Sequence, residues 1–244
     1  MAPIPEQVDV SPHPASAPLK PVSRTPSRDR ISDRVTEELS SAIRDLRLKP
    51  GAPLSETELS QQLGVSRTPL REAISKLVDR GVLTVVSQVG TRVALIDLAE
   101  VEEACFIRCA LETAAFKVAC EVGRLETQGL RRILLRQERA VADGDVESFF
   151  ASDEDLHQEI FRLGKHPGAW NVVRGSKLQL DRLRWLILPD AIATRDLIDE
   201  HTRIVDLLEA GDVVSGVSLI SEHSRHVLDQ APRVRSEYPD YFTS

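Results

Sequence analysis

Between residues 31 and 95 the hydrophobic pattern changes from a helical period to a strand period, and this change strongly limits the folds open to the chain. Four apolar residues first recur at helical spacing: Val35, Leu39, Ile43 and Leu46. The segment "KPGAP" ends this first predicted helix. A second short helix is expected over residues 56–63, and Gly64 ends it.

A third helix is predicted to begin after Ser66, which is well placed as its N-cap, and to end near Gly81. Its apolar stripe consists of Leu70, Ile74 and Leu77. Two β-rich runs follow, "VLTVV" and "TRVAL", joined by "SQVG" with Gly90 at the tip of a hairpin. Three helices followed by a β-hairpin predict a winged helix-turn-helix.

Two arginines stand at the start of the third helix, where the helix dipole disfavours cations. Arg67 and Arg71 are four residues apart, so they share a face opposite the apolar stripe. In helix-turn-helix proteins this end of the recognition helix enters the major groove, where arginine binds guanine. Thr68 could contact a phosphate or a thymine methyl group. The alternative is that both arginines are surface charges paired with Glu72 or Asp79. The whole arrangement favours DNA binding.

The composition of the 244-residue chain, with 41% hydrophobic and 28% charged residues, is typical of a soluble, globular protein. It lacks an apolar run of about 18 or more residues, so no membrane span is expected, and its first residues lack the apolar core typical of a signal peptide. Three cysteines, Cys105, Cys109 and Cys120, fall within one predicted helix and fit a reducing cytosol. The net charge of −7 arises after residue 95, outside the winged region. We therefore expect a cytoplasmic protein.

The chain is expected to divide into four regions. Residues 1–30 are rich in proline and serine and poor in large apolar side chains, which predicts a disordered tail. Residues 31–96 form the winged helix-turn-helix. Residues 97–231 form an all-helical domain, and residues 232–244 form a C-terminal tail.

The helical region contains no strand pattern, and turn signals divide it into an antiparallel bundle of six helices. The expected helices run roughly over residues 98–123, 126–143, 146–164, 168–188, 192–210 and 212–230. The expected fold is therefore mostly α: a winged helix-turn-helix followed by a six-helix bundle.

Four polar residues interrupt the apolar stripes of three bundle helices: Asp153, His157, His201 and His223. Ionised groups buried without partners cost several kcal/mol, and one divalent metal would satisfy all four. Three imidazoles and a carboxylate suit Zn²⁺, Ni²⁺, Mn²⁺ or Fe²⁺. The alternatives are a hydrogen-bonded core cluster without metal, and ligation by His226 in place of His223.

The winged region resembles the DNA-binding domain of GntR-type bacterial transcription regulators in "PGAPLSETELSQQLGVSRTPLREAISKLVDRGVL" and "VGTRVAL". The resemblance implies a homodimer that binds a pseudopalindromic double-stranded DNA operator, with the wing in the minor groove. Carried over to this chain, the DNA contacts fall on the start of the recognition helix and on the wing: Ser66, Arg67, Thr68, Arg71 and Gly90. Val89 departs from the polar or charged residue of some relatives.

The helical region resembles the FCD ligand-binding domain of the FadR branch in "SDEDLHQEIF", "DEHTRIVDLLEAGD" and "SEHSRHVL". Six helices, rather than seven, would place it in the VanR-like subgroup. The resemblance implies that the Asp and three His named above bind a divalent metal, with zinc expected in purified protein. It also implies that the metal holds a small carboxylate effector. His166, in "KHP", departs from the Gly-Asn-Pro of many relatives.

Arg108 lies on the apolar stripe of the first bundle helix. It could pair with Glu112 one turn later, or it could bind the effector carboxylate through its two-pronged guanidinium. The two roles are compatible, since Glu112 could orient the arginine. The FCD resemblance implies the effector-binding role.

These observations predict a DNA-binding transcription regulator, rather than an enzyme, that acts as a repressor and is controlled by a small organic acid at a metal site. One alternative is a repressor that senses the metal ion itself. Another is a metallohydrolase using the same Asp-His₃ set, which would leave the winged region unexplained. A metal-free, acyl-CoA-binding relative is disfavoured by the four candidate ligands.

Overall fold

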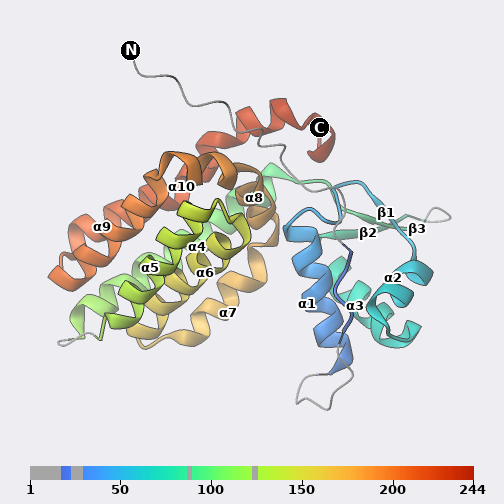
Figure 1. Ribbon diagram of the computed structural model, residues 1–244, viewed down its shortest axis with the longest axis horizontal. Helices are drawn as coiled ribbons and strands as arrows, with labels where there is room; N and C mark the ends of the chain where they lie inside the picture. Colours follow the sequence, from blue (N-terminus) through green and yellow to red (C-terminus); the bar gives the residue numbers. More distant parts are fainter. Residues whose placement is uncertain (1–17, 23–29, 87–89, 123–125) are drawn as a thin grey trace.

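The winged helix-turn-helix predicted from the change of period is present in the computed structural model, which describes residues 18–22, 30–86, 90–122 and 126–244. Its three helices are α1 (Ile31–Arg44), α2 (Glu56–Leu63) and α3 (Arg67–Asp79). Their apolar stripes meet in one core that includes Leu39, Leu63, Leu70 and Leu77, all fully buried. This domain lies beside one end of the helical bundle (Figure 1).

A small antiparallel sheet completes the domain, in the order β1-β3-β2. The strands are β1 (Pro53–Leu54), β2 (Leu83–Val86) and β3 (Gly90–Val93). Val86 pairs with Gly90, whose φ of 109° suits glycine, so the predicted hairpin is confirmed at this end. Val89 lies outside the described residues. The strand β1 was not predicted, because two residues are too few to show an alternating pattern.

Part of the expected N-terminal tail is ordered against the winged domain. Leu19 is only 6% exposed and joins its core. The backbone N–H of Val22 donates to the carbonyl of Leu63 at 3.0 Å. The expectation of a disordered tail is therefore wrong for residues 18–22, where two apolar side chains find a surface to cover. Residues 1–17 and 23–29 lie outside the described part.

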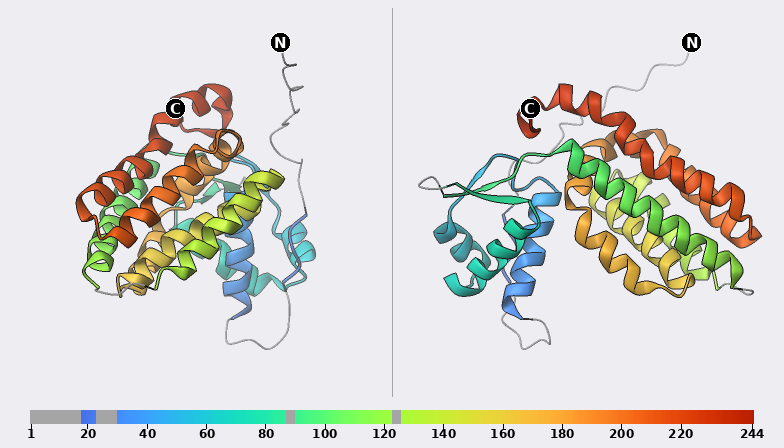
Figure 2. Two further views of the ribbon diagram at one scale, coloured as in Figure 1. Left: turned by 60° about the vertical axis from the view of Figure 1, so that its left-hand side comes forward. Right: turned by 180° about the vertical axis from the view of Figure 1, so that it is seen from behind.

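The second domain is a helical bundle, as predicted, but within the described residues it has seven helices rather than six (Figure 2). They are α4 (Leu98–Glu121), α5 (Gln128–Asp143), α6 (Val146–Leu163), α7 (Pro167–Ser176), α8 (Leu178–Thr194), α9 (Asp196–Ala210) and α10 (Val213–Glu237). The helix count therefore does not support the VanR-like subgroup. None of the described helices has the length and apolar character needed to cross a membrane.

The extra helix arises because the single helix expected over 168–188 is broken at Lys177. The Lys177 side chain is 1% exposed, and its ammonium donates to both carboxylate oxygens of Asp181 at 2.7 Å. At this break between α7 and α8, the Lys177 side chain points into the protein rather than into solvent. Conversely, Pro189 does not end α8, which continues to Thr194, so the helix boundary expected between residues 188 and 192 is absent from the described structure.

The expected C-terminal tail is also structured. The helix α10 runs past Pro232 to Glu237, and the short 3₁₀ helix η1 (Pro239–Tyr241) follows it. Phe242 is 5% exposed and forms an isolated parallel β-bridge with Ile96, which lies in the connection between the two domains. Buried apolar side chains therefore hold this segment against the domain junction.

The close approach of α10 to α4 depends on Gly216. A Cβ atom at this position would lie 2.2 Å from ring atoms of Phe116, which is fully buried. We expect Gly216→Ala to lower the free energy of unfolding by about 1–3 kcal/mol, the usual cost of overpacking a core. Chemical denaturation measures this change.

A matched control is Gly175→Ala in α7, where an added Cβ would meet no atom within 4 Å. This variant should be stabilised by about 0.4–1 kcal/mol, because alanine restricts the unfolded chain. Equal stability of the two variants would contradict the close packing of α10 on α4.

Candidate metal centre and DNA-binding surface

The start of α3 presents a polar surface to solvent, as a DNA-reading helix requires. Ser66 is the N-cap residue, as expected, but its side chain makes no capping hydrogen bond. The Ser66 hydroxyl is therefore not engaged in capping the helix. Ser66, Arg67 and Thr68 are all exposed, and Gly90 is exposed at the start of β3. The strands β2 and β3 extend away from the bundle (Figure 1).

Arg71 takes neither of the acidic partners considered from sequence. Its Nε donates to Glu56 of α2 at 2.8 Å, and the Arg71 side chain is 64% exposed. Exposed ion pairs contribute about 0–1 kcal/mol, so this one leaves the guanidinium available to a stronger anion such as a DNA phosphate.

The four polar residues predicted on apolar stripes converge inside the bundle. Asp153 and His157 come from α6, His201 from α9 and His223 from α10, and all four are buried. Each offers one ligand atom, and these atoms all lie within 4.8 Å of one another. Oδ1 of Asp153 lies 3.4 Å from Nε2 of His201 and 3.7 Å from Nε2 of His157. One ion could contact all four side chains.

A second group of side chains orients the three imidazoles through Nδ1. The partners are Glu112 for His157, Gln137 for His201 at 2.9 Å and Glu200 for His223 at 2.8 Å. Metal-binding histidines in proteins characteristically use one ring nitrogen this way and bind the ion with the other. Nε2 of His201 has no partner among the described residues, whereas Nε2 of His157 accepts a hydrogen bond from Arg108, which an ion on that nitrogen would have to displace. His226 is 54% exposed and contacts Glu200 at 3.1 Å, so its environment differs from that of the buried His223.

Two buried atoms at the centre have no hydrogen-bond partner among the described residues: Oδ1 of Asp153 and Nε2 of His201. An unpaired buried polar atom is costly, and such atoms are rare in native structures. Both belong to the candidate ligand set and lie 3.4 Å apart. A bound cation would satisfy them, so the residues present fit a divalent metal.

The protonation states of two of the four candidate ligands also suit a metal, while the pKa of His157 is raised because Glu112 and Asp153 outweigh the lowering by burial. Burial lowers the pKa of His201 well below its usual value, and the nearby His223 lowers it further. Burial alone would raise the pKa of Asp153, but Arg184 and His157 outweigh it and hold that pKa well below its usual range. At neutral pH the site therefore offers a neutral imidazole and a carboxylate, the forms that bind metals.

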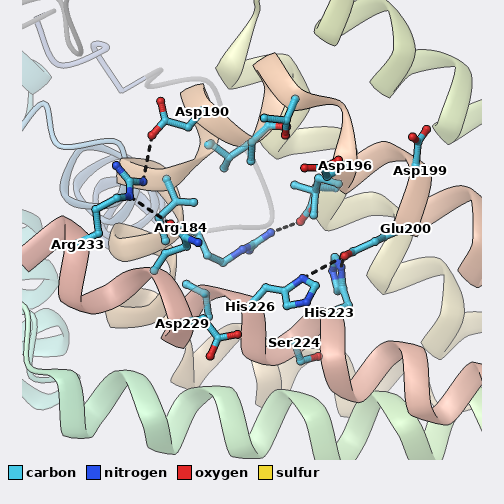
Figure 3. Close-up of a pocket in the computed structure, with 18 of the residues that line it drawn as sticks. Arg184, Asp190, Asp196, Asp199, Glu200, His223, Ser224, His226, Asp229 and Arg233 are labelled. Atoms are coloured by element: carbon cyan, nitrogen blue, oxygen red, sulfur yellow. Dashed lines mark hydrogen bonds and ion pairs between the residues drawn. The ribbon is translucent and has the colours of Figure 1, made fainter.

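A cavity of about 670 Å³ opens beside the centre, between α8, α9 and α10 (Figure 3). Asp153, His223 and Arg108 line it. Nε of Arg108 donates to Glu112 at 3.3 Å, and its Nη2 donates to Nε2 of His157 at 2.6 Å. Arg108 therefore makes the expected pair with Glu112 and also lines the cavity, while its binding of an effector carboxylate stays a prediction.

Arg184 of α8 also lines this cavity and was not predicted from sequence. Its Nη2 donates to Oδ2 of Asp153, and its Nη1 donates to Glu154 and Asp181 at 2.9 and 3.0 Å. The sequence signal was the segment "RLRWLIL", in which two arginines stand among apolar residues. Arg108 and Arg184 therefore both contact candidate metal ligands, and Arg203 and Arg233 line the cavity farther along.

The role of Gln137 can be tested by Gln137→Leu, which removes the acceptor for Nδ1 of His201. We expect the affinity for Zn²⁺ to fall about 10–100-fold, the usual cost of losing a group that orients a ligand. Competition with a chromogenic chelator measures it. The control is Glu138→Gln, an exposed neighbour on α5. Equal affinities of the two variants would count against this role.

A winged helix-turn-helix joined to an all-helical domain is the architecture of a DNA-binding transcription regulator. Residues 31–93 match the family described as "Bacterial regulatory proteins, gntR family", and residues 103–226 match the FCD domain. The protein therefore belongs to the GntR family of regulators that carry an FCD domain. It is a transcriptional regulator and not an enzyme.

Similar proteins agree with this assignment. A Streptomyces ambofaciens HTH-type transcriptional regulator in an unstable DNA locus is 36% identical, over 85% of this chain and 87% of that protein. The HTH-type transcriptional repressor RspR of Escherichia coli K12 is 29% identical, over 80% and 86%. The solved structure of E. coli McbR/YncC superimposes with a TM-score of 0.71 and 23% identity, over 83% and 99%.

Proposed function

We propose that this protein is a repressor whose operator affinity is controlled by a small carboxylate, bound to a divalent metal in the FCD domain. The observation that carries the proposal is the pair of unpartnered buried atoms on Asp153 and His201, beside an open cavity whose lining includes Arg108 and Arg184. The E. coli relative RspR is a transcriptional repressor by name, which favours repression over activation for this protein.

On the DNA side, we propose a homodimer that places two recognition helices in successive major grooves of a pseudopalindromic operator. The reading residues are the exposed groups at the start of α3 and on the wing: Ser66, Arg67, Thr68, Arg71 and Gly90. Such a regulator acts on the chromosome, which places it in the cytoplasm.

On the effector side, the ligands are Asp153, His157, His201 and His223, with Zn²⁺ the expected ion in purified protein and Ni²⁺, Mn²⁺ or Fe²⁺ as alternatives. The metal would supply a positive charge that anchors a carboxylate. Arg108 and Arg184 line the same cavity, and their guanidiniums suit a carboxylate through charge-assisted hydrogen bonds.

A thermal-shift screen tests the effector proposal. Purified, tag-free protein is heated with small mono- and dicarboxylates, with Zn²⁺ or with EDTA. A ligand present at 100 times its Kd adds about 2.7 kcal/mol of stability. We expect one class of acid to raise the melting temperature only when metal is present. A shift by the metal alone, with no acid adding to it, would favour a metal-sensing repressor, and no shift by either would contradict the metal centre.

A further inference from the structure

The helix α8 forms a wall shared by the effector cavity and the DNA-binding domain. Arg184 faces the cavity and donates to Asp153. Arg182, two residues earlier, donates from Nη2 to the carbonyl of Ala94 at 2.7 Å, just beyond the wing strand β3. Side chains two residues apart on a helix point in different directions, so one short segment reaches both domains.

A purely structural role does not explain why an arginine, rather than an apolar residue, is buried at position 182. It is fully buried, and among the described residues no carboxylate lies within ion-pair distance of it. Its Nη1 donates to Gln179 at 2.9 Å, and its Nε has no described partner. Burial lowers the pKa of Arg182 to about 10, so it stays charged at neutral pH. A buried charge held only by neutral acceptors is costly, and a hydrocarbon side chain would fill this space at lower cost.

The segment that Arg182 contacts is the connection between the domains. Only residues 94–97 separate β3 from α4, and the carbonyls of the first three are all held by the bundle or by the C-terminal segment. The donors are Arg182 to Ala94, Gln179 to Leu95 at 3.5 Å and the backbone N–H of Thr243 to Ile96 at 3.0 Å. Because this short connection is hydrogen-bonded to Arg182 and Gln179 of α8, a displacement of α8 would also move the end of β3, at the base of the wing.

The ring of Phe150 provides a second connection between the effector cavity and the DNA-binding domain. The ring of Phe150 on α6 has the guanidinium of Arg184 4.9 Å from its centre. The guanidinium of Arg44, at the end of α1 in the DNA-binding domain, is also 4.9 Å from that centre. The position of Arg184 is therefore coupled through packing to α1 as well as to the wing.

We infer that Arg182 transmits occupancy of the FCD cavity to the wing, because α8 joins its contact with Ala94 to the contact of Arg184 with Asp153. The inference rests on the proposed function, since it takes Asp153 as a metal ligand. Metal binding changes the charge that Arg184 faces at Asp153. The resulting shift of α8 moves the carbonyl of Ala94 through Arg182, so Arg182 is a positioning residue that touches neither metal nor DNA.

The test uses the full chain, Zn²⁺ as the probe and the variant Arg182→Met, with Arg132→Met, an exposed arginine on α5, as control. Zinc affinity is measured by chelator competition. Hydrogen exchange is followed in peptides that cover residues 82–86 and 90–96. Binding to an operator duplex obtained by in vitro selection is measured with and without zinc. In wild type and control we expect zinc to change wing exchange and to change operator affinity by about 5-fold or more.

In Arg182→Met we expect unchanged zinc affinity, with both zinc-dependent changes lost. If this variant does not fold, Gln179→Met, which removes an acceptor of Arg182, should weaken both changes. Retention of the zinc-dependent changes in these variants would overturn the inference and leave the metal site intact. Zinc binding to wild type without any change at the wing would also overturn it. Failure of wild type to bind zinc would instead contradict the proposed function itself.

Discussion

Replacing His201 by alanine is expected to remove tight metal binding. Its Nε2 is one of the two unpartnered buried atoms, and its Nδ1 is already held by Gln137. Loss of a direct ligand should cost more than the roughly 10–100-fold in affinity that loss of an orienting group costs. Chelator competition with Zn²⁺ measures the change, and a circular dichroism spectrum checks that the bundle remains helical.

The matched control is His226→Ala. His226 is exposed and contacts Glu200 from the solvent side, so its removal should leave zinc affinity nearly unchanged. If His226→Ala lost affinity as severely as His201→Ala, His226 would have to be counted among the ligands in place of His223. If His201→Ala kept full affinity, the four residues would be a hydrogen-bonded core cluster.

The variant Arg67→Ala is expected to weaken operator binding about 5- to 140-fold, which corresponds to the roughly 1–3 kcal/mol that a bidentate base contact contributes. Arg67 is exposed in the first turn of α3, where helix-turn-helix proteins contact bases. The variant should also lose discrimination at one operator position. Fluorescence anisotropy with a selected operator and single-base substitutions measures both effects.

Arg80→Ala supplies the comparison, since Arg80 is an exposed arginine at the C-cap of the same helix. Its removal changes the net charge by the same amount, and we expect a much smaller loss that is uniform across operator sequences. Equal losses from the two variants would mean that Arg67 adds only general electrostatic attraction.

The winged domain and the existence of the bundle could be predicted from sequence because their signals are local. Leu70, Ile74 and Leu77 mark one helix face, and Gly90 marks the hairpin, whatever surrounds them. The four candidate ligands were found for a related reason: polar residues on apolar stripes are conspicuous. The structure brings these four together, while their binding of an ion stays a prediction.

Features that depend on distant contacts were missed. The break at Lys177 coincides with its buried ion pairs to Glu154 and Asp181, and Glu154 belongs to another helix. The burial of Leu19 and Phe242 requires surfaces formed elsewhere in the chain. Arg184, Gln137 and Glu200 owe their places at the candidate centre to helix packing, which spacing along one helix does not reveal. The carboxylates and amide around the histidines therefore emerge only from the structure.

The most direct test of the account is operator affinity measured in four conditions: with neither ligand, with Zn²⁺ alone, with the acid from the thermal-shift screen alone, and with both. If the effector is held through the metal centre, the acid weakens operator binding in the presence of zinc and has no effect on EDTA-treated protein. The same acid should have no effect on Asp153→Ala in any condition. An acid that acts equally well on EDTA-treated protein would contradict control through the metal centre.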